Sequence, residues 1–316
     1  LWCWSWIRIM PIQQMLLGIS ADAGTAGDTF STTGVTTGLV QHIDFGKIAC
    51  YNPAVNTWDV SDLSGNNNHM VIGSAGNLDY GNVHSVGTTQ LPNVHFNSAN
   101  GGHLDLNQSL DNISGRTYSN SSNSDFPKLS RLTDVWPRPS SGIVNFALEY
   151  WVNPYFGSRT STYPNNYLTS DFWNLDRRAY FERTGNRLRI CPTSSYSYAN
   201  SATIDVTISQ TMTQNQYLGW QHIVYTQTAT SGTNNFKVYI NNQNLFTGTT
   251  SYSNSNLGRS GISFPTTWDG FWNSEANDVS GSFDGKWAII RFYYNKGLSA
   301  SEVTQNWNSQ RVRFGL

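Results

Sequence analysis

The acidic residues of the predicted strands are the first candidates for chemistry in this sequence. Cleavage of a glycosidic bond with retention needs two carboxyl groups about 5–5.5 Å apart, and two acids at alternate positions of one strand face can supply that separation. Glu149, in FALEYWVNP, has Trp151 and Asn153 at those positions, and Asp205 lies between two threonines. The pair of acids that this reaction needs is missing from both strands. Because the sequence shows no other catalytic pattern either, we expect a protein that is not an enzyme.

The histidines and the remaining acids form no catalytic or zinc pattern. Asp59 and Asp62 stand beside a turn, where they suit the capping of backbone N–H groups better than catalysis. His222, in GWQHIV, is predicted to be a buried strand residue, whereas His69 and His103, near turns, are expected at the surface, with ligand binding as the alternative. The six histidines show neither a Ser/His/Asp order nor zinc spacing: His42, His69, His84, His95, His103 and His222.

Composition limits the fold class and the partners. The 316-residue chain has a formal net charge of −1 and 12% charged residues, so it lacks the charge pattern of proteins that bind nucleic acid or anionic membranes. Aromatic residues reach 14%, and Asn, Ser, Thr and Gly separate short apolar runs. This mixture predicts an all-β protein of many short strands and polar turns.

The cysteines do not form a disulfide framework by their number or spacing. There are three of them, Cys3, Cys50 and Cys191, and an odd count cannot pair completely. We expect small buried apolar side chains, with one bridge as the alternative.

Alternating apolar runs predict several strands and two hairpins. VHFNSANGGHLDL, at 94–106, reads as a hairpin around Asn-Gly-Gly, and NFKVYINNQNLFTG reads as one around Asn241-Asn242, because Gly and Asn tolerate positive φ. The strand in FALEYWVNP is expected to end at Pro154, which has no N–H for the ladder.

The run FDGKWAIIRFYY predicts a strand that is covered on both sides. Simple alternation places Trp287, Ile289 and Tyr293 on one face and Ala288, Ile290 and Phe292 on the other, and both faces are then apolar. The chain next enters a well-marked helix.

That helix has a complete start signal. Ser299 and Glu302 have the spacing of a capping box, and Leu298 and Val303 can form the hydrophobic staple beside it. Val303 and Trp307 are four residues apart and share a face. We therefore expect a short helix that packs on the preceding strand.

Five segments follow one another along the chain in this order: WDVSDLSGNNNHMVI, VHFNSANGGHLDL, FALEYWVNP, WQHIVYTQTATSGTNNFKVYINNQ and FDGKWAIIRFYYNKGLSASEVTQNWN. Together they resemble the laminin G-like domains of the concanavalin A-like lectin/glucanase superfamily. The resemblance covers roughly 38–315 and implies an antiparallel two-sheet jelly-roll sandwich. We assign 37–316 to this domain and 1–36 to an N-terminal arm and linker. Long insertions at 107–142, 155–175 and 260–280 depart from the family pattern.

Relatives of this kind often hold calcium on loops, and the resemblance makes calcium a candidate cofactor. Calcium prefers six to eight oxygen ligands, and Asp269, Glu275, Asn277 and Asp278 cluster in TTWDGFWNSEANDVSG. A solvated polar loop is the alternative. No other cofactor is predicted.

The same loop has the residue types of a glycan-binding surface, which are flat apolar rings beside hydrogen-bonding groups. The candidates are Trp268, Asp269, Phe271, Trp272 and Asn273. Further aromatic candidates are Tyr155, Tyr163, Tyr167, Phe172 and Trp173. A core or subunit contact is the alternative for each group.

The arm is apolar, but Arg8, Pro11 and two glutamines interrupt it, so it does not read as a membrane span. We expect it to bury its apolar side chains in an assembly; a cleaved leader is the alternative. The side chains expected to do so are Trp2, Trp4, Trp6, Ile12, Leu16 and Leu17.

Two short segments resemble virion proteins of tailed phages. MPIQQMLLG, from Met10, is similar to the opening of virion structural proteins, and the closing RVRFGL is similar to the tails of laminin G-like proteins in phage genomes. Residues 1–9 have no explanation in this resemblance.

Two hypotheses follow. The first is a non-enzymatic virion structural protein of a tailed phage, in a fibre, decoration or tail-associated appendage. It would assemble in the host cytoplasm with copies of itself and other virion proteins, and it would bind host-surface glycans. The alternative is a secreted or cell-surface carbohydrate-binding or adhesion lectin module that is extracellular and not part of a virion.

Overall fold

A computed structural model gives the arrangement of the chain. It describes residues 34–52, 54, 59–73, 95–105, 128–129, 145–156, 166–169, 171–172, 179–182, 187–190, 204–207, 216–230, 233–251, 262–263 and 285–316. All the strand pairs in these ranges are antiparallel.

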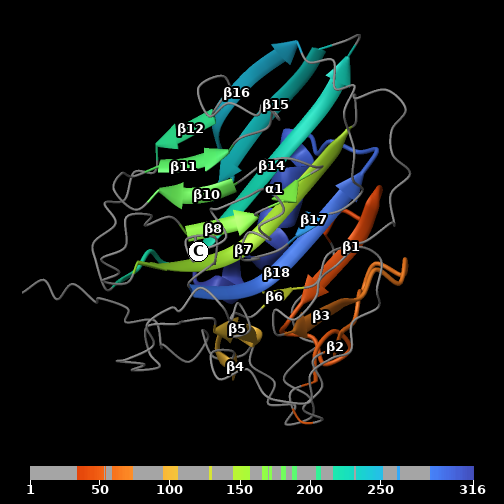
Figure 1. The fold of residues 1–316 in the computed structure, drawn as a ribbon, viewed down its shortest axis with the longest axis vertical. Coiled ribbons are helices and arrows are strands. Elements are labelled where there is room, and N and C mark those ends of the chain that lie inside the picture. Colours follow the sequence, from red (N-terminus) through yellow and green to blue (C-terminus); the bar gives the residue numbers. More distant parts are fainter. Residues whose placement is uncertain are drawn as a thin grey trace, which may run out of the picture.

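One large sheet forms the centre of the molecule (Figure 1). Among the described residues it has nine strands, and β7 and β18 pair at its middle. In spatial order the main path is β16 (Gln243–Ser251), β15 (Thr233–Ile240), β14 (Gln221–Thr230), β7 (Phe146–Phe156), β18 (Gly285–Tyr294), β5 (His103–Asp105) and β4 (His95–Asn97). β1 (Leu39–Asp44) also pairs with β18, and β13 (Gln216–Tyr217) pairs with β7.

Shorter strands make a second layer in front of the large sheet (Figure 1). One group is β12 (Ile204–Thr207), β11 (Arg187–Ile190), β10 (Ala179–Glu182) and β8 (Asn166–Thr169). The others are β2 (Asp59–Val60), β3 (Met70–Gly73) and β6 (Lys128–Leu129), and the pair β9 (Asp171–Phe172) and β17 (Ile262–Ser263).

The main core lies between the two layers. Leu188 of β11 and Val206 of β12 are buried in the same cluster as Leu148, Tyr150 and other residues of the large sheet. Burial of each such side chain contributes roughly 1.5–3 kcal/mol. The structure therefore confirms the predicted all-β antiparallel sandwich of the jelly-roll type.

Both predicted hairpins are confirmed. β4 and β5 pair around the 3-10 turn η3 (Ala99–Gly101), and β15 and β16 are joined at Asn241 and Asn242, whose φ values of 50° and 65° fit a two-residue turn. The predicted end at Pro154 is wrong. β7 continues to Phe156. Proline has no N–H that must be paired, and its carbonyl can still take part in strand pairing: the Pro154 carbonyl accepts the Leu218 N–H at 2.9 Å.

The predicted alternation in β18 is also wrong, although both faces are apolar as expected. A register shift between Trp287 and Ile289 places Ala288 and Ile289 together on one face. Trp287 thus lies on the core face with Ile290 and Phe292. Alternation alone cannot reveal such a β-bulge, because the extra residue changes the face of every residue before it.

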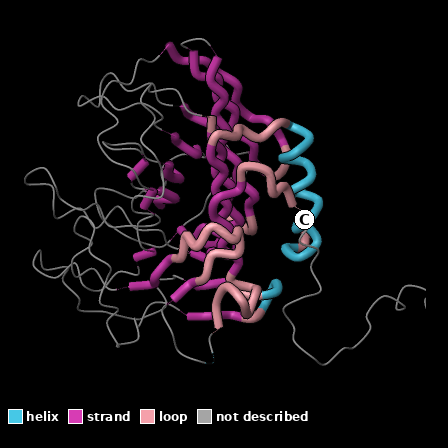
Figure 2. Tube along the Cα trace, turned by 90° about the vertical axis from the view of Figure 1, so that its right-hand side faces the viewer, coloured by secondary structure: helices cyan, strands magenta, loops and turns pink. Residues whose placement is uncertain are grey.

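The helix α1 (Ala300–Gln310) covers the other face of the large sheet (Figure 2), followed by the 3-10 turn η6 (Arg311–Phe314). Its capping box is present: the Ser299 N–H donates to Glu302 Oε2 at 2.8 Å, and the Glu302 N–H donates to Ser299 Oγ at 3.3 Å. Leu298 and Val303 are buried together against the sheet. The predicted terminal helix and its packing on β18 are confirmed.

Replacement of the cap should weaken the attachment of this helix. Ser299→Ala removes the acceptor of the Glu302 N–H, so we expect a loss of about 1 kcal/mol in the free energy of unfolding, measured by urea denaturation. Asn308→Ala, at an exposed position of the same helix, is the control and should change stability by less than about 0.5 kcal/mol. Equal losses in both variants would show that the cap has no special role.

Candidate functional site

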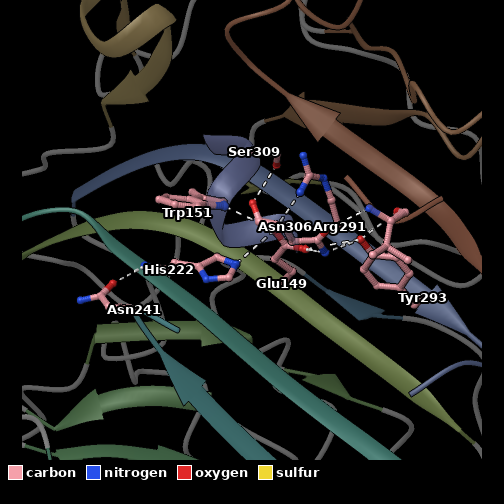
Figure 3. Close-up of polar contacts among 9 residues, drawn as sticks. Glu149, Trp151, His222, Asn241, Arg291, Tyr293, Asn306 and Ser309 are labelled. Carbon is pink, nitrogen blue, oxygen red and sulfur yellow. Dashed lines mark hydrogen bonds and ion pairs between the residues drawn. The ribbon is translucent and has the colours of Figure 1, made fainter. Parts of the chain in front are cut away.

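A buried carboxylate lies between the large sheet and α1, at the centre of what we call the Glu149 cluster (Figure 3). Glu149 is completely buried, and its Oε1 accepts from Arg291 Nη1 at 2.8 Å, from His222 Nε2 at 3.2 Å and from Trp151 Nε1 at 3.3 Å. These partners come from β18, β14 and β7. The pairings Val224↔Glu149 and Arg291↔Glu149 show that three neighbouring strands bring the cluster together.

The other carboxylate oxygen ties the C-terminal helix to the sheet. Glu149 Oε2 accepts from Asn306 Nδ2 at 2.6 Å and lies 3.4 Å from the Tyr293 hydroxyl. The Asn306 amide oxygen in turn accepts the Val35 N–H at 2.7 Å. The cluster therefore joins the segment before β1, the central strands and α1.

Electrostatics keep this carboxylate charged. Burial alone raises the pKa of Glu149, but the Arg291 guanidinium and the hydrogen bonds from His222 and Trp151 outweigh burial and lower that pKa to about 2. Burial likewise lowers the pKa of Arg291, yet the Glu149 carboxylate more than compensates, so the Arg291 pKa is raised. A buried ion pair with these additional hydrogen bonds is strongly held, and removal of one partner alone is costly.

The complete burial of Glu149 and the negative charge of its carboxylate together exclude acid catalysis by this residue. A carboxylic acid that protonates a leaving group needs a raised pKa and access to substrate, whereas Glu149 is ionised, completely buried and hydrogen-bonded to Trp151 and Asn306. The Trp151 and Trp307 rings stack at 5.5 Å. The Glu149 cluster thus holds the fold together and does not open to a ligand.

A second buried ion pair fastens the end of the chain. Arg313 Nη1 donates to both oxygens of Asp44, at 2.8 and 3.0 Å, while its other nitrogens donate to the carbonyls of Asn100 and Gly102 at 2.6 and 2.7 Å. Gly46 lies against the guanidinium, so closely that a Cβ there would collide with it. Arg313 of RVRFGL thus has a structural role.

The histidine predictions have mixed outcomes. His222 is buried in β14, as predicted. His69 is exposed and its Nδ1 accepts the Asp62 N–H at 3.1 Å. The surface prediction for His103 is wrong: the side chain is fully buried, because its Nδ1 donates to the Ala99 carbonyl of the η3 turn at 3.0 Å and its ring packs against Trp220, with 5.4 Å between the ring centroids.

Asp62 and Cys50 lie as the sequence indicated. Asp62 accepts the backbone N–H groups of His42, Ser64 and Asn68 at 2.8–3.0 Å, which is the capping role expected of it. Cys50 is buried with a free thiol, and burial raises the pKa of that thiol well above its usual range.

A group of half-buried aromatic and charged side chains lies at one end of the large sheet, on the strands β7, β13, β18 and β5. We call it the Tyr217 cluster, and it comprises Tyr155, Tyr217, Lys286 and Asp105. The two tyrosine rings are 4.9 Å apart, Lys286 Nζ lies 4.6 Å from the centroid of the Tyr217 ring, and the Tyr217 hydroxyl is 3.4 Å from Asp105 Oδ1.

Strand register explains why these side chains meet. Tyr217 pairs with Tyr155, and Lys286 pairs with Asp105 and with Asn153 of β7, so cross-strand neighbours share one face. Sequence reasoning singled out Tyr155 but missed the other three. Only the pairing of strands far apart in sequence brings them together, so no local pattern could have identified them.

The other predicted site residues fall outside the described residues. This applies to the glycan candidates 268–273, to the calcium candidates Asp269, Glu275, Asn277 and Asp278, and to the arm residues 1–33. Tyr163 and Trp173 also lie outside, while the backbones of Tyr167 and Phe172 lie in β8 and β9. These assignments remain predictions.

The described ranges contain no group of three or more His, Cys, Asp or Glu side chains placed to hold a metal ion. In the same part of the chain, no helix has the length and apolar character needed to cross a membrane.

Comparison with solved structures supports the fold. The binding domain of botulinum neurotoxin DC, solved in complex with rat synaptotagmin II, matches with a TM-score of 0.50 and 15% identity over 88% of this chain and 52% of that one. The binding domain of botulinum neurotoxin serotype D/C VPI 5993 matches with a TM-score of 0.50 and 13% identity over 86% of this chain and 52% of that one. The chain thus spans about half the length of these toxin domains.

A third match is domain 4 of a GH43 extracellular arabinanase from Geobacillus stearothermophilus, solved in complex with arabinotriose. Its TM-score is 0.47, with 19% identity over 85% of this chain and 97% of that one. No protein-family model and no curated protein matches the sequence.

Separation of the Glu149–Arg291 pair should be far more costly than its joint replacement. Arg291→Met leaves a buried carboxylate without its cation, and we expect a loss of about 3–5 kcal/mol; Glu149→Gln should also destabilise. The double variant should lose clearly less than the sum of the two single losses in urea denaturation, because neither charge is then left alone. Additive losses would contradict a direct pair.

Stability should also fall in mild acid. Burial and the nearby Arg291 lower the pKa of His42 to about 4, against the opposing effect of Asp44, Glu149 and Asp62. His42 therefore takes up a proton near pH 6.5 in the unfolded chain, but only near pH 4 in the folded chain. As the pH falls from 6.5 to 4, the free energy of unfolding decreases by at most about 3 kcal/mol. The actual decrease is smaller than this limit because His42 is partly exposed to solvent.

Urea denaturation between pH 7.5 and 4.5 measures this loss. His42→Asn should flatten the pH dependence without removing it, because the pKa of His103 is also lowered by burial. An unchanged slope in His42→Asn would contradict the assignment.

Proposed function

We propose that this chain is a non-enzymatic glycan-binding module that serves as an appendage protein of a tailed-phage particle. The observation that carries glycan binding is the Tyr217 cluster. Two partly exposed tyrosine rings in mutual contact supply apolar surface, and Asp105 and Lys286 supply an acceptor and a donor beside them. Sugars are bound by this combination of flat apolar surface and converging polar groups.

The state of Glu149 supports the absence of catalysis. The strand acid Glu149 is ionised and completely buried beneath α1, so it cannot donate a proton to a leaving group. The second layer and the helix cover both faces of the central strands. Ligand binding is therefore assigned to the ends of the sheet and to the loops, including the predicted residues Trp268 and Trp272.

The phage assignment rests on the resemblance of MPIQQMLLG to virion proteins and on the apolar arm. In a particle, many copies would act together, and weak binding at each site would become strong attachment. A secreted lectin module is the alternative function. Proteomics and negative-stain imaging of the native source test the choice: the chain in particles of defined symmetry supports the virion, and secretion without particles contradicts it.

Substitutions in the Tyr217 cluster test glycan binding. On a glycan array, Tyr155→Ala and Tyr217→Ala should each weaken binding roughly tenfold or less, because one ring contact is worth about 0.5–1.5 kcal/mol. Tyr217→Phe keeps the ring and should lose less. Trp268→Ala and Trp272→Ala test the predicted loop in the same assay.

Val312→Ala, at a position that is 73% exposed, is the control and should bind as the original protein does. No glycan bound by the unmodified protein, or binding that none of the Tyr and Trp substitutions changes, would contradict the proposed site.

A further inference from the structure

Among the described residues, one edge of the large sheet is the strand β16, at the upper end of the molecule in Figure 1. Within the described ranges, β16 pairs with β15 alone and stands last in the strand order. Its side chains reach solvent along most of its length, and Leu245 is 41% exposed. A strand in this position offers unpaired backbone N–H and C=O groups to another strand.

Apart from one bulge, this strand lacks the features that usually block edge pairing. Proteins place charges, prolines or bulges on such edges to prevent association, whereas QNLFTGTTS contains no charged residue and no proline. One bulge is present, at Leu245, where the register shifts. Beyond the bulge, Phe246–Ser251 pairs regularly with β15 and forms an uninterrupted edge of six residues.

On its core-facing side, β16 carries little side-chain bulk at Gly248. Gly248 has no side chain, and the Phe246 ring occupies the adjacent space, so closely that a Cβ at Gly248 would lie 2.6 Å from it. On the other face, Thr247 and Thr249 are exposed. Threonine is well suited to strands and can form cross-strand hydrogen bonds.

The absence of charge points to a second copy of this chain as the partner. When a strand pairs with itself about a two-fold axis, each residue near the axis faces itself or a near neighbour, so any charge there would meet a like charge. β16 avoids this repulsion. The nearest cation in the paired strand is Lys237 of β15, opposite Thr247. Two such lysines would be separated by three strand spacings, roughly 14 Å, beyond the screening length of about 8 Å.

We propose that two copies associate through antiparallel pairing of Phe246–Ser251, which joins their large sheets into one continuous sheet. This inference concerns assembly and does not depend on glycan binding. The dimer would carry two Tyr217 clusters, because each copy keeps its own on strands other than β16.

Analytical ultracentrifugation of the full chain, over a range of concentrations, tests the proposal. We expect a concentration-dependent dimer. Thr247→Lys and Thr249→Lys place like charges beside the two-fold axis and should each raise the dimer dissociation constant at least roughly tenfold, by about 1.4 kcal/mol or more. Asn308→Lys adds the same charge on the exposed surface of α1 and should leave the dimer unchanged.

Hydrogen exchange gives a second measurement that locates the interface. The amides of Phe246–Ser251 should exchange more slowly as the protein concentration rises, and this protection should disappear in Thr249→Lys. A protein that is monomeric at all concentrations, or a dimer unaffected by both lysine substitutions, would overturn the proposal. Urea denaturation checks that the variants are folded.

Discussion

The structure depends on one buried carboxylate. Glu149 makes contacts with side chains of β7, β14, β18 and α1, and none of these elements could pack as closely if the charge had no partner, because a lone buried charge is strongly destabilising. Asn306 is the partner that the helix supplies. The docking of α1 is therefore specified by a hydrogen bond as well as by apolar area, since the amide must meet the carboxylate in one position.

Coverage of both faces of the central strands explains where binding can occur. Tyr150 and Trp287 face the second layer, and Trp151 and Ile289 face the C-terminal segment. Such strands have no open surface for a ligand. Among the described residues, accessible surface remains at the end of the sheet, where Tyr155 and Tyr217 are half-buried, and at the β16 edge. The two proposals concern these two places.

Local patterns in the sequence were sufficient for the all-β class, both hairpins and the cap at Ser299, because turns and caps depend on neighbouring residues. The two-sheet sandwich was implied by the resemblance to laminin G-like domains. The local patterns failed where distant segments decide. The bulge in β18, the continuation past Pro154 and the burial of His103 depend on the partner strand or on a folded turn. Arg291 and Asn306 lie 142 and 157 residues from Glu149, so one sequence could not pair them. The loop residues 268–278 remain predictions.

The attachment of Arg313 and Asn306 to much earlier parts of the chain has a consequence for biosynthesis. Asp44 and Glu149 leave the ribosome long before residues 306–314, which neutralise or cover them. Until then, the side chains that pack with Phe314 in the folded protein stay in contact with water or with a chaperone; they include Trp151, Trp220 and Ile289. Contacts of such long sequence separation form slowly, and partly folded chains with exposed apolar strands are prone to aggregate. Emergence of α1 and η6 from the ribosome is therefore the step at which these earlier segments first become able to complete their native packing.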